Sequence, residues 1–73
     1  MSGTVEAIRA LLGEHVELPA GDDDELGLPS FVVIVVAEEL EAREGFIIAA
    51  RELVAENFAT VARIAAFVER KRR

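Results

Sequence analysis

SFVVIVVAEELEARE, residues 30–44, carries two conflicting signals, and the choice between them decides the fold. Five consecutive β-branched residues, Val32 to Val36, favour a strand, whereas the acidic second half favours a helix. A lone strand would find no pairing partner elsewhere in the chain. We therefore predict a helix over 30–44 that ends at Gly45. One stripe of this helix is apolar and should face the core: Val33, Val36, Ala37 and Leu40.

Apolar periodicity and turn signals predict three more helices. The first covers about 4–16, with Thr4 as its N-cap. A short helix is expected at about 50–55, and the last at about 60–71, capped by Thr60 or Asn57. The other residues expected in the core are Val5, Ile8, Leu11, Leu12 and Val16, then Phe46, Ile48 and Leu53, then Phe58, Val61, Ile64, Ala65 and Val68.

The remaining segment, residues 17–29, joins the first two helices. It contains Pro19, Gly21, Gly27 and Pro29 around an acidic run, 22–25, and is expected to form a solvated loop. The chain has 73 residues and no internal repeat, so we predict one all-α domain over 1–73, a small four-helix bundle with a short third helix. A domain of this size buries little surface, so its stability should be modest.

Composition excludes several classes of chemistry. The chain has no cysteine, which rules out disulfides and thiol catalysis, and its single histidine, His15, leaves too few partners for a zinc site or a serine triad. We assign His15 no role and expect no enzyme activity. The longest apolar run, Phe31 to Ala37, is too short to cross a bilayer, and the N-terminus lacks a signal-peptide pattern. These features favour a soluble, cytoplasmic protein that does not associate with membranes.

The charge is distributed unevenly along the chain. Residues 1–69 hold fourteen acidic and four basic side chains, a net charge of −10, while residues 70–73 read RKRR. An acidic body repels phosphate backbones, so a basic protein partner is favoured over nucleic acid. The basic tail alone could suggest that the chain binds nucleic acid or a membrane surface. Its simpler interpretation is a set of cations that interact favourably with a helix C-terminus.

Ser30 stands alone before the apolar run of the 30–44 helix. If the predicted stripe faces inward, Val32 and Val35 lie on the flank that also carries Ser30 and Phe31, and they form an exposed apolar patch. The alternative is that Ser30 only caps the helix and that all the valines are buried. The start of a helix favours a phosphate ester on the serine oxygen, and no second catalytic group is near in sequence. Ser30 is therefore interpreted as an acceptor of a modification, not as a nucleophile.

Two segments of the sequence resemble motifs of the acyl and peptidyl carrier protein family. That family commonly shows Gly-[hydrophobic]-Asp-Ser-[Leu/Ile/Phe] and, later, Glu-Asn-Phe-x-[Ser/Thr]-Val at the start of the last helix. The resemblance extends without gaps over about residues 25–69. The matching residues are Gly27, Leu28, Ser30 and Phe31, then Glu56, Asn57, Phe58, Thr60 and Val61.

The resemblance implies a four-helix carrier of acyl-carrier-protein type, in which a phosphopantetheinyl transferase attaches 4′-phosphopantetheine from coenzyme A to Ser30. The thiol of this arm would hold acyl or aminoacyl groups as thioesters, so a cofactor would supply the sulfur chemistry that the chain lacks. The implied partners are the transferase, an acyl- or aminoacyl-loading ligase, and downstream synthase or tailoring enzymes. The carrier itself is expected to be a monomer.

The sequence departs from the family pattern around the serine. Pro29 replaces the usual aspartate, which removes an acid that helps the transferase recognise the serine, although proline also suits the start of a helix. Val32 and Val35 replace acids that usually pair with cations of partner enzymes. We therefore predict a more apolar docking surface, with Glu38, Glu39 and Glu41 supplying electrostatic steering. The residues of this predicted docking surface are Phe31, Val32, Val35, Glu38 and Glu39.

These departures favour a dedicated carrier of polyketide, nonribosomal-peptide or similar specialised biosynthesis over one of primary fatty-acid synthesis. The alternative function is an unmodified helical interaction module that keeps the carrier fold and binds partners through the apolar patch. The two functions differ in whether Ser30 is ever esterified.

Overall fold

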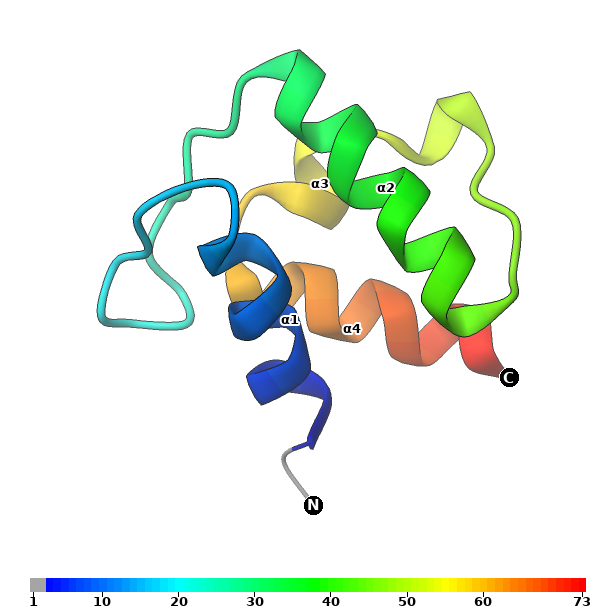
Figure 1. Cartoon of the computed structure of the whole chain (residues 1–73), viewed down its shortest axis with the longest axis horizontal. Coiled ribbons are helices and arrows are strands. Elements are labelled where there is room, and N and C mark those ends of the chain that lie inside the picture. The colour runs from blue at the N-terminus through cyan, green and yellow to red at the C-terminus, as the bar shows by residue number, and fades with distance from the viewer. Residues whose placement is uncertain (1–2) are drawn as a thin grey trace.

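The computed structural model describes residues 3–73, and these contain helices and no strand (Figure 1). The predicted all-α class and the small four-helix bundle are confirmed. The elements are α1 (Gly3–Gly13), α2 (Ser30–Glu44), a 3₁₀ turn η1 (Ala50–Glu52), α3 (Ala55–Phe58) and α4 (Val61–Arg72).

The helix predicted over 30–44 matches α2 at both ends. Pro29 precedes it with φ −63° and ψ 155°, an extended conformation that leads into the first turn. At the other end Gly45 adopts φ 83°, and its N–H donates to the carbonyl of Glu41. A left-handed backbone conformation costs the least free energy when the residue is glycine, which explains why α2 ends at this position.

The first helix is shorter than predicted and begins differently. It ends at Gly13, and a turn follows in which His15 and Val16 both donate their amides to the carbonyl of Leu12. Thr4 lies inside the first turn of α1 and is not an N-cap that precedes it. Its hydroxyl instead donates to Glu69 of α4 at 2.7 Å. The Thr4 hydroxyl therefore contacts a distant helix and does not cap α1.

The segment predicted as one short helix at 50–55 is divided into η1 and α3. Two hydrogen bonds stabilise the division: the Ala49 amide donates to the Glu52 carboxylate at 2.8 Å, and the Asn57 side chain donates to the Glu52 carbonyl at 2.9 Å. Asn57 lies within α3 and does not cap α4. Thr60 is the N-cap of α4, as predicted, and its hydroxyl accepts the Arg63 amide at 3.1 Å.

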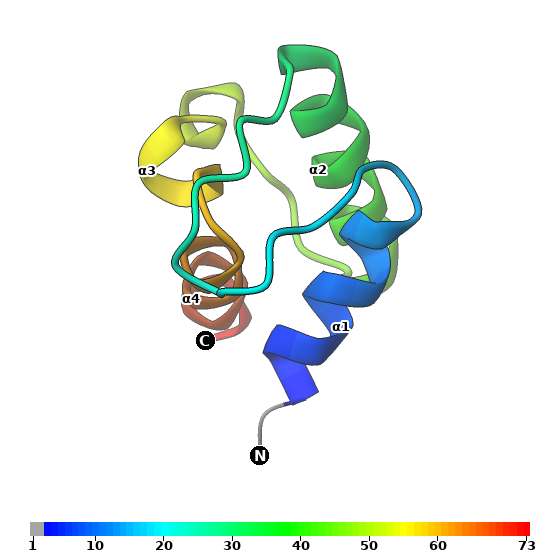
Figure 2. The same ribbon diagram turned by 90° about the vertical axis from the view of Figure 1, so that its left-hand side faces the viewer.

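The helices surround one apolar core, with α4 packed against both α1 and α3 (Figure 2). Most predicted core positions are buried, but Val5, Val16, Val33, Phe46, Ile48 and Leu53 are only half-buried against the core. Val32 and Phe67 are buried although neither was predicted. The buried apolar residues are Ile8, Leu11, Leu12, Val32, Val36, Ala37, Leu40, Phe58, Val61, Ile64, Ala65, Phe67 and Val68.

The acidic loop is attached to the bundle at several points. Arg9 of α1 pairs with the Asp22 carboxylate at 2.8 Å and also donates to two loop carbonyls. The Asp22 carbonyl accepts the Ala62 amide in the first turn of α4, and the Leu26 amide donates to the carbonyl of Ala59. The loop that was predicted to be solvated is therefore held against α1 and α4 by these bonds. They restrict the conformation of the segment that precedes Ser30.

Candidate functional site

Ser30 is the first residue of α2, and its side chain is exposed. Its hydroxyl makes no hydrogen bond with any residue in the range 3–73, so the possibility that Ser30 caps the helix is wrong. The first backbone bonds of the helix run from the amides of Val32 and Val33 to the carbonyl of Pro29, at 3.0 and 3.1 Å. The amides of Ser30 and Phe31 precede these bonds, and they give this end of the helix a partial positive charge.

An open apolar groove adjoins Ser30, between the start of α2 and the 53–59 segment. It consists of two neighbouring hollows of about 250 and 220 Å³ that share Leu28, Val33 and Leu53 in their walls. Ser30 and Ile34 complete the first hollow, and Phe58 lines the second. A larger hollow of about 370 Å³ lies between α1 and α4, but none of its lining residues belongs to the segment around Ser30.

The exposed apolar surface of α2 differs from the predicted one. Phe31 is 70% exposed and Val35 36%, as expected, but Val32 is only 7% exposed and belongs to the core. Val32 lies two turns before Glu39, so both share a helix flank, and Glu39 contacts His15 in the turn after α1. That flank therefore faces the turn and not solvent, which makes the docking role predicted for Val32 wrong. Ile34 is 48% exposed and takes its place on the exposed face, which was not predicted.

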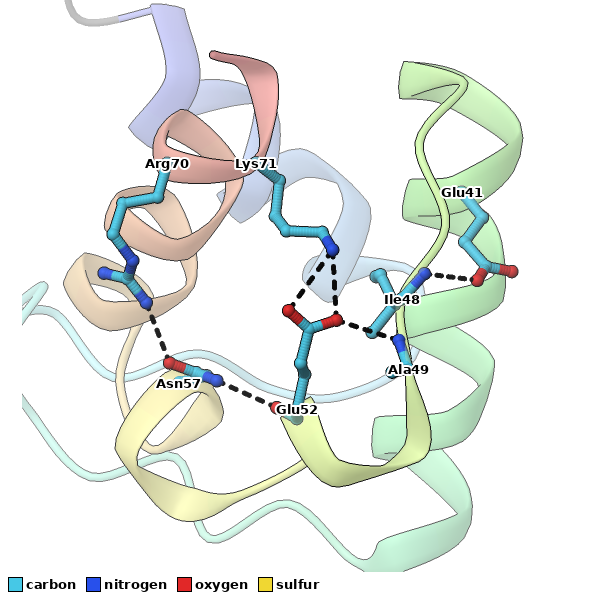
Figure 3. Close-up of polar contacts among 7 residues, drawn as sticks. All are labelled: Glu41, Ile48, Ala49, Glu52, Asn57, Arg70 and Lys71. Atoms are coloured by element: carbon cyan, nitrogen blue, oxygen red, sulfur yellow. Dashed lines mark hydrogen bonds and ion pairs between the residues drawn. The ribbon is translucent and has the colours of Figure 1, made fainter.

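The predicted steering acids on α2 occupy three different environments. Glu38 is exposed and has no hydrogen-bond or ion-pair partner among residues 3–73. Glu39 is half-buried and lies 3.2 Å from the His15 imidazole. Glu41 is also half-buried and accepts the Ile48 amide at 2.7 Å (Figure 3). Of the three acids, Glu38 is the one whose charge is fully available to a partner.

The basic end of α4 holds the chain segment that follows α2. Three cationic side chains reach polar groups of α2, η1 and α3, and we call this set of contacts the C-terminal clasp. Figure 3 shows the contacts of Arg70 and Lys71. It fixes the segment that carries Leu53, which is a wall of the groove. The clasp pairs Arg72 with Glu44 at 2.8 and 2.9 Å, Lys71 with Glu52 at 3.0 and 3.2 Å, and Arg70 with Asn57 at 3.0 Å.

Acidification should weaken the C-terminal clasp. The hydrogen bond from Arg72 lowers the pKa of Glu44 below its ordinary value of 4.5, and the Ala49 amide, followed by Lys71, lowers the pKa of Glu52. Because both folded-state pKa values are lowered, the stability that the carboxylates contribute is complete above about pH 5 and is lost as the pH falls through those values. The measurement is the urea midpoint between about pH 7 and pH 3.

The control for this measurement is the double variant Glu44→Gln/Glu52→Gln, which keeps the shape of both side chains and removes their titration. We expect the urea midpoint of the parent to fall more steeply below about pH 5 than that of the variant. Parallel pH profiles would show that ionisation of Glu44 and Glu52 does not contribute to folding stability.

No family model matches the chain, and no curated protein and no solved structure is significantly similar to it. The resemblance to carrier proteins therefore stays a prediction. Within residues 3–73, no helix is long and apolar enough to span a bilayer.

The structure brings together some of the predicted site residues and separates others. Ser30 and Phe31 begin α2 together, and Val35 follows one turn later on an exposed face. Val32 turns into the core, and Glu39 faces the end of α1. The groove walls at Leu53 and Phe58 were predicted only as core positions, because nothing in a local pattern indicates that α3 lies opposite Ser30.

Proposed function

We propose that this protein is a carrier that holds thioester-linked intermediates on a 4′-phosphopantetheine arm attached to the hydroxyl oxygen of Ser30. The observation that carries the proposal is an exposed serine hydroxyl without a hydrogen-bond partner among residues 3–73, at the first position of α2. A transferase can reach this oxygen without breaking an internal bond. The partial positive charge of the helix start stabilises the negative charge of the resulting phosphodiester.

The groove beside Ser30 supports a role in sheltering the arm or a short cargo. Leu28, Val33, Ile34 and Leu53 give it apolar walls that begin at the attachment point. A hollow of about 250 Å³ is small compared with typical ligand pockets of roughly 300–1,000 Å³. It suits a short acyl or aminoacyl group better than a long chain. The chain itself catalyses nothing in this proposal and presents the tethered group to successive enzymes at high effective concentration.

The surface around Ser30 supports docking to partner enzymes through apolar contacts. Phe31, Ile34 and Val35 are exposed on the first turns of α2, and the exposed acid Glu38 follows them. A partner with an apolar patch rimmed by basic side chains would complement this surface. The partners proposed are a phosphopantetheinyl transferase, an acyl- or aminoacyl-loading ligase, and synthase or tailoring enzymes of specialised biosynthesis in the cytoplasm.

Attachment of the arm is tested by the intact mass of the protein after incubation with coenzyme A and a broad-specificity phosphopantetheinyl transferase. We expect the parent chain to gain one phosphopantetheinyl group, because the Ser30 hydroxyl is exposed and makes no hydrogen bond with residues 3–73. The Ser30→Ala variant should gain nothing. Since Ser30 makes no side-chain hydrogen bond with the described residues, this variant should unfold at the same urea concentration as the parent.

Pro29→Asp restores the acid that the family motif carries before the serine and provides a second test. If the parent stays unmodified and Pro29→Asp accepts the arm, the proline blocks the natural chain, which then acts as the unmodified interaction module. If neither chain gains mass while a known carrier does, Ser30 is not an attachment point.

A further inference from the structure

Three potential metal ligands lie together on the far side of α2 from the groove residues. Glu14 and His15 belong to the turn after α1, and Glu39 lies in the second half of α2. Their ligand atoms all lie within 4.8 Å of one another, and the His15 Nε2 atom is 3.2 Å from a carboxylate oxygen of Glu39. None of the three lines the groove beside Ser30.

The backbone holds these three residues in place. The amides of Glu14 and His15 donate to the carbonyls of Leu11 and Leu12, at 3.3 and 2.9 Å, and both leucine side chains are fully buried. Glu39 precedes Leu40, which is 2% exposed and anchors that turn of α2 in the core. The folded core therefore fixes the three Cα positions, and metal binding would require only side-chain rotation.

We propose that Glu14, His15 and Glu39 bind one divalent transition-metal ion of the Zn²⁺ class. The His15 Nε2 atom and one oxygen from each glutamate are the ligands, and water takes the fourth position. Tetrahedral Zn²⁺ with bonds of about 2.0–2.2 Å places neighbouring ligand atoms roughly 3.4 Å apart. The His15–Glu39 pair at 3.2 Å already has this spacing, and Glu14, which is exposed, has to approach.

The donor set determines the class of metal. An imidazole nitrogen favours Zn²⁺ and its transition-metal neighbours over Mg²⁺ and Ca²⁺, which prefer oxygen ligands alone. Two carboxylates with a neutral imidazole carry a charge of −2, which matches a divalent cation. The net charge of the chain, −6, also attracts cations. A single histidine is too few nitrogen ligands for zinc by itself, but the fold adds a carboxylate from another helix.

Binding would connect the end of α1 to α2 across the loop of residues 17–29. The two ends of that loop would then be held by the ion as well as by the core. Because the site exists only in the folded chain, the binding free energy adds to the stability of the fold. This inference concerns residues outside the groove and does not depend on modification of Ser30.

The test is titration of the chelator-treated, tag-free full chain with Zn²⁺ by calorimetry, together with its thermal midpoint with and without the ion. We expect one Zn²⁺ per chain and a higher midpoint. His15→Ala and Glu39→Gln should each weaken binding by at least about tenfold, because even changes outside the ligand shell cost about 10–100-fold in metal proteins. Circular dichroism establishes that each variant is folded.

Glu38→Gln is the matched control, since it removes an adjacent exposed acid that is not a ligand, and its affinity should equal that of the parent. Mg²⁺ at the same concentration should not compete. If several Zn²⁺ ions bind weakly and His15→Ala does not change their affinity, the ions bind to carboxylates at several places on the surface. That result would overturn the proposal. Absence of any binding at 1:1 stoichiometry would overturn it as well.

Discussion

Replacing Phe67 with alanine is expected to lower the free energy of unfolding by about 3–5 kcal/mol. The Phe67 side chain is 2% exposed, and its ring centroid lies 5.4 Å from that of Phe58, the residue that ends α3. Its removal would leave a cavity where α3 meets α4. Chains of this length have a total stability of about 4–11 kcal/mol, so the variant should lose a large share of it. Urea unfolding followed by circular dichroism measures the loss.

Phe31→Ala is the matched control, because it deletes the same side chain from a position that is 70% exposed. We expect it to change the free energy of unfolding by less than about 0.5 kcal/mol. If Phe67→Ala does not fold, Phe67→Leu keeps most of the volume and should show a smaller loss in the same direction. Equal effects at Phe31 and Phe67 would show that Phe67 does not pack in the core.

Local signals were sufficient to predict the helices whose ends carry specific capping residues. The bounds of α2 follow from Pro29 and Gly45, two residues whose backbone preferences act without help from the rest of the fold. Thr60 caps α4 as predicted for the same reason. Most of the core was also predictable, since the apolar residues of α1 and α4 recur at helical spacing.

Predictions failed where distant segments decide the local structure. Phe67 lies outside the apolar stripe of α4 and is buried because Phe58 packs against it. The predicted helix at 50–55 is interrupted after Glu52, whose carboxylate binds the Ala49 amide and Lys71 of α4. The Phe58–Phe67 contact joins two helices, and Lys71 lies 19 residues from Glu52, so the spacing of residues within one helix does not indicate these contacts.

In the candidate site, too, local features were predictable and contacts between distant segments were not. The position of Ser30 at the start of α2 was predictable from the short motif around it. The groove beside it was not, because its far wall comes from Leu53 to Ala59. Likewise, His15 was assigned no role because Glu39, its partner, lies 24 residues away in sequence. Groups brought together by tertiary packing leave no signal in the local sequence pattern.

The pair Val32→Glu and Val35→Glu should separate the core of α2 from its exposed surface. Val32 is 7% exposed and Val35 is 36% exposed, although they lie three residues apart on one helix. A carboxylate at 32 would be buried without a partner, so we expect a loss of about 3 kcal/mol or more in the free energy of unfolding. At 35 the loss should stay below about 0.5 kcal/mol.

Because we expect the Val35→Glu chain to stay folded, its effect on partner binding can be interpreted. If the exposed residues of α2 dock the transferase, Val35→Glu should raise the KM for the carrier in the modification assay, while Ser30 remains fully modifiable at saturating enzyme. An unchanged KM would exclude Val35 from that docking surface. If instead Val32→Glu were as stable as Val35→Glu, Val32 would have to lie at the surface, and the docking surface predicted from the sequence would regain its third apolar residue.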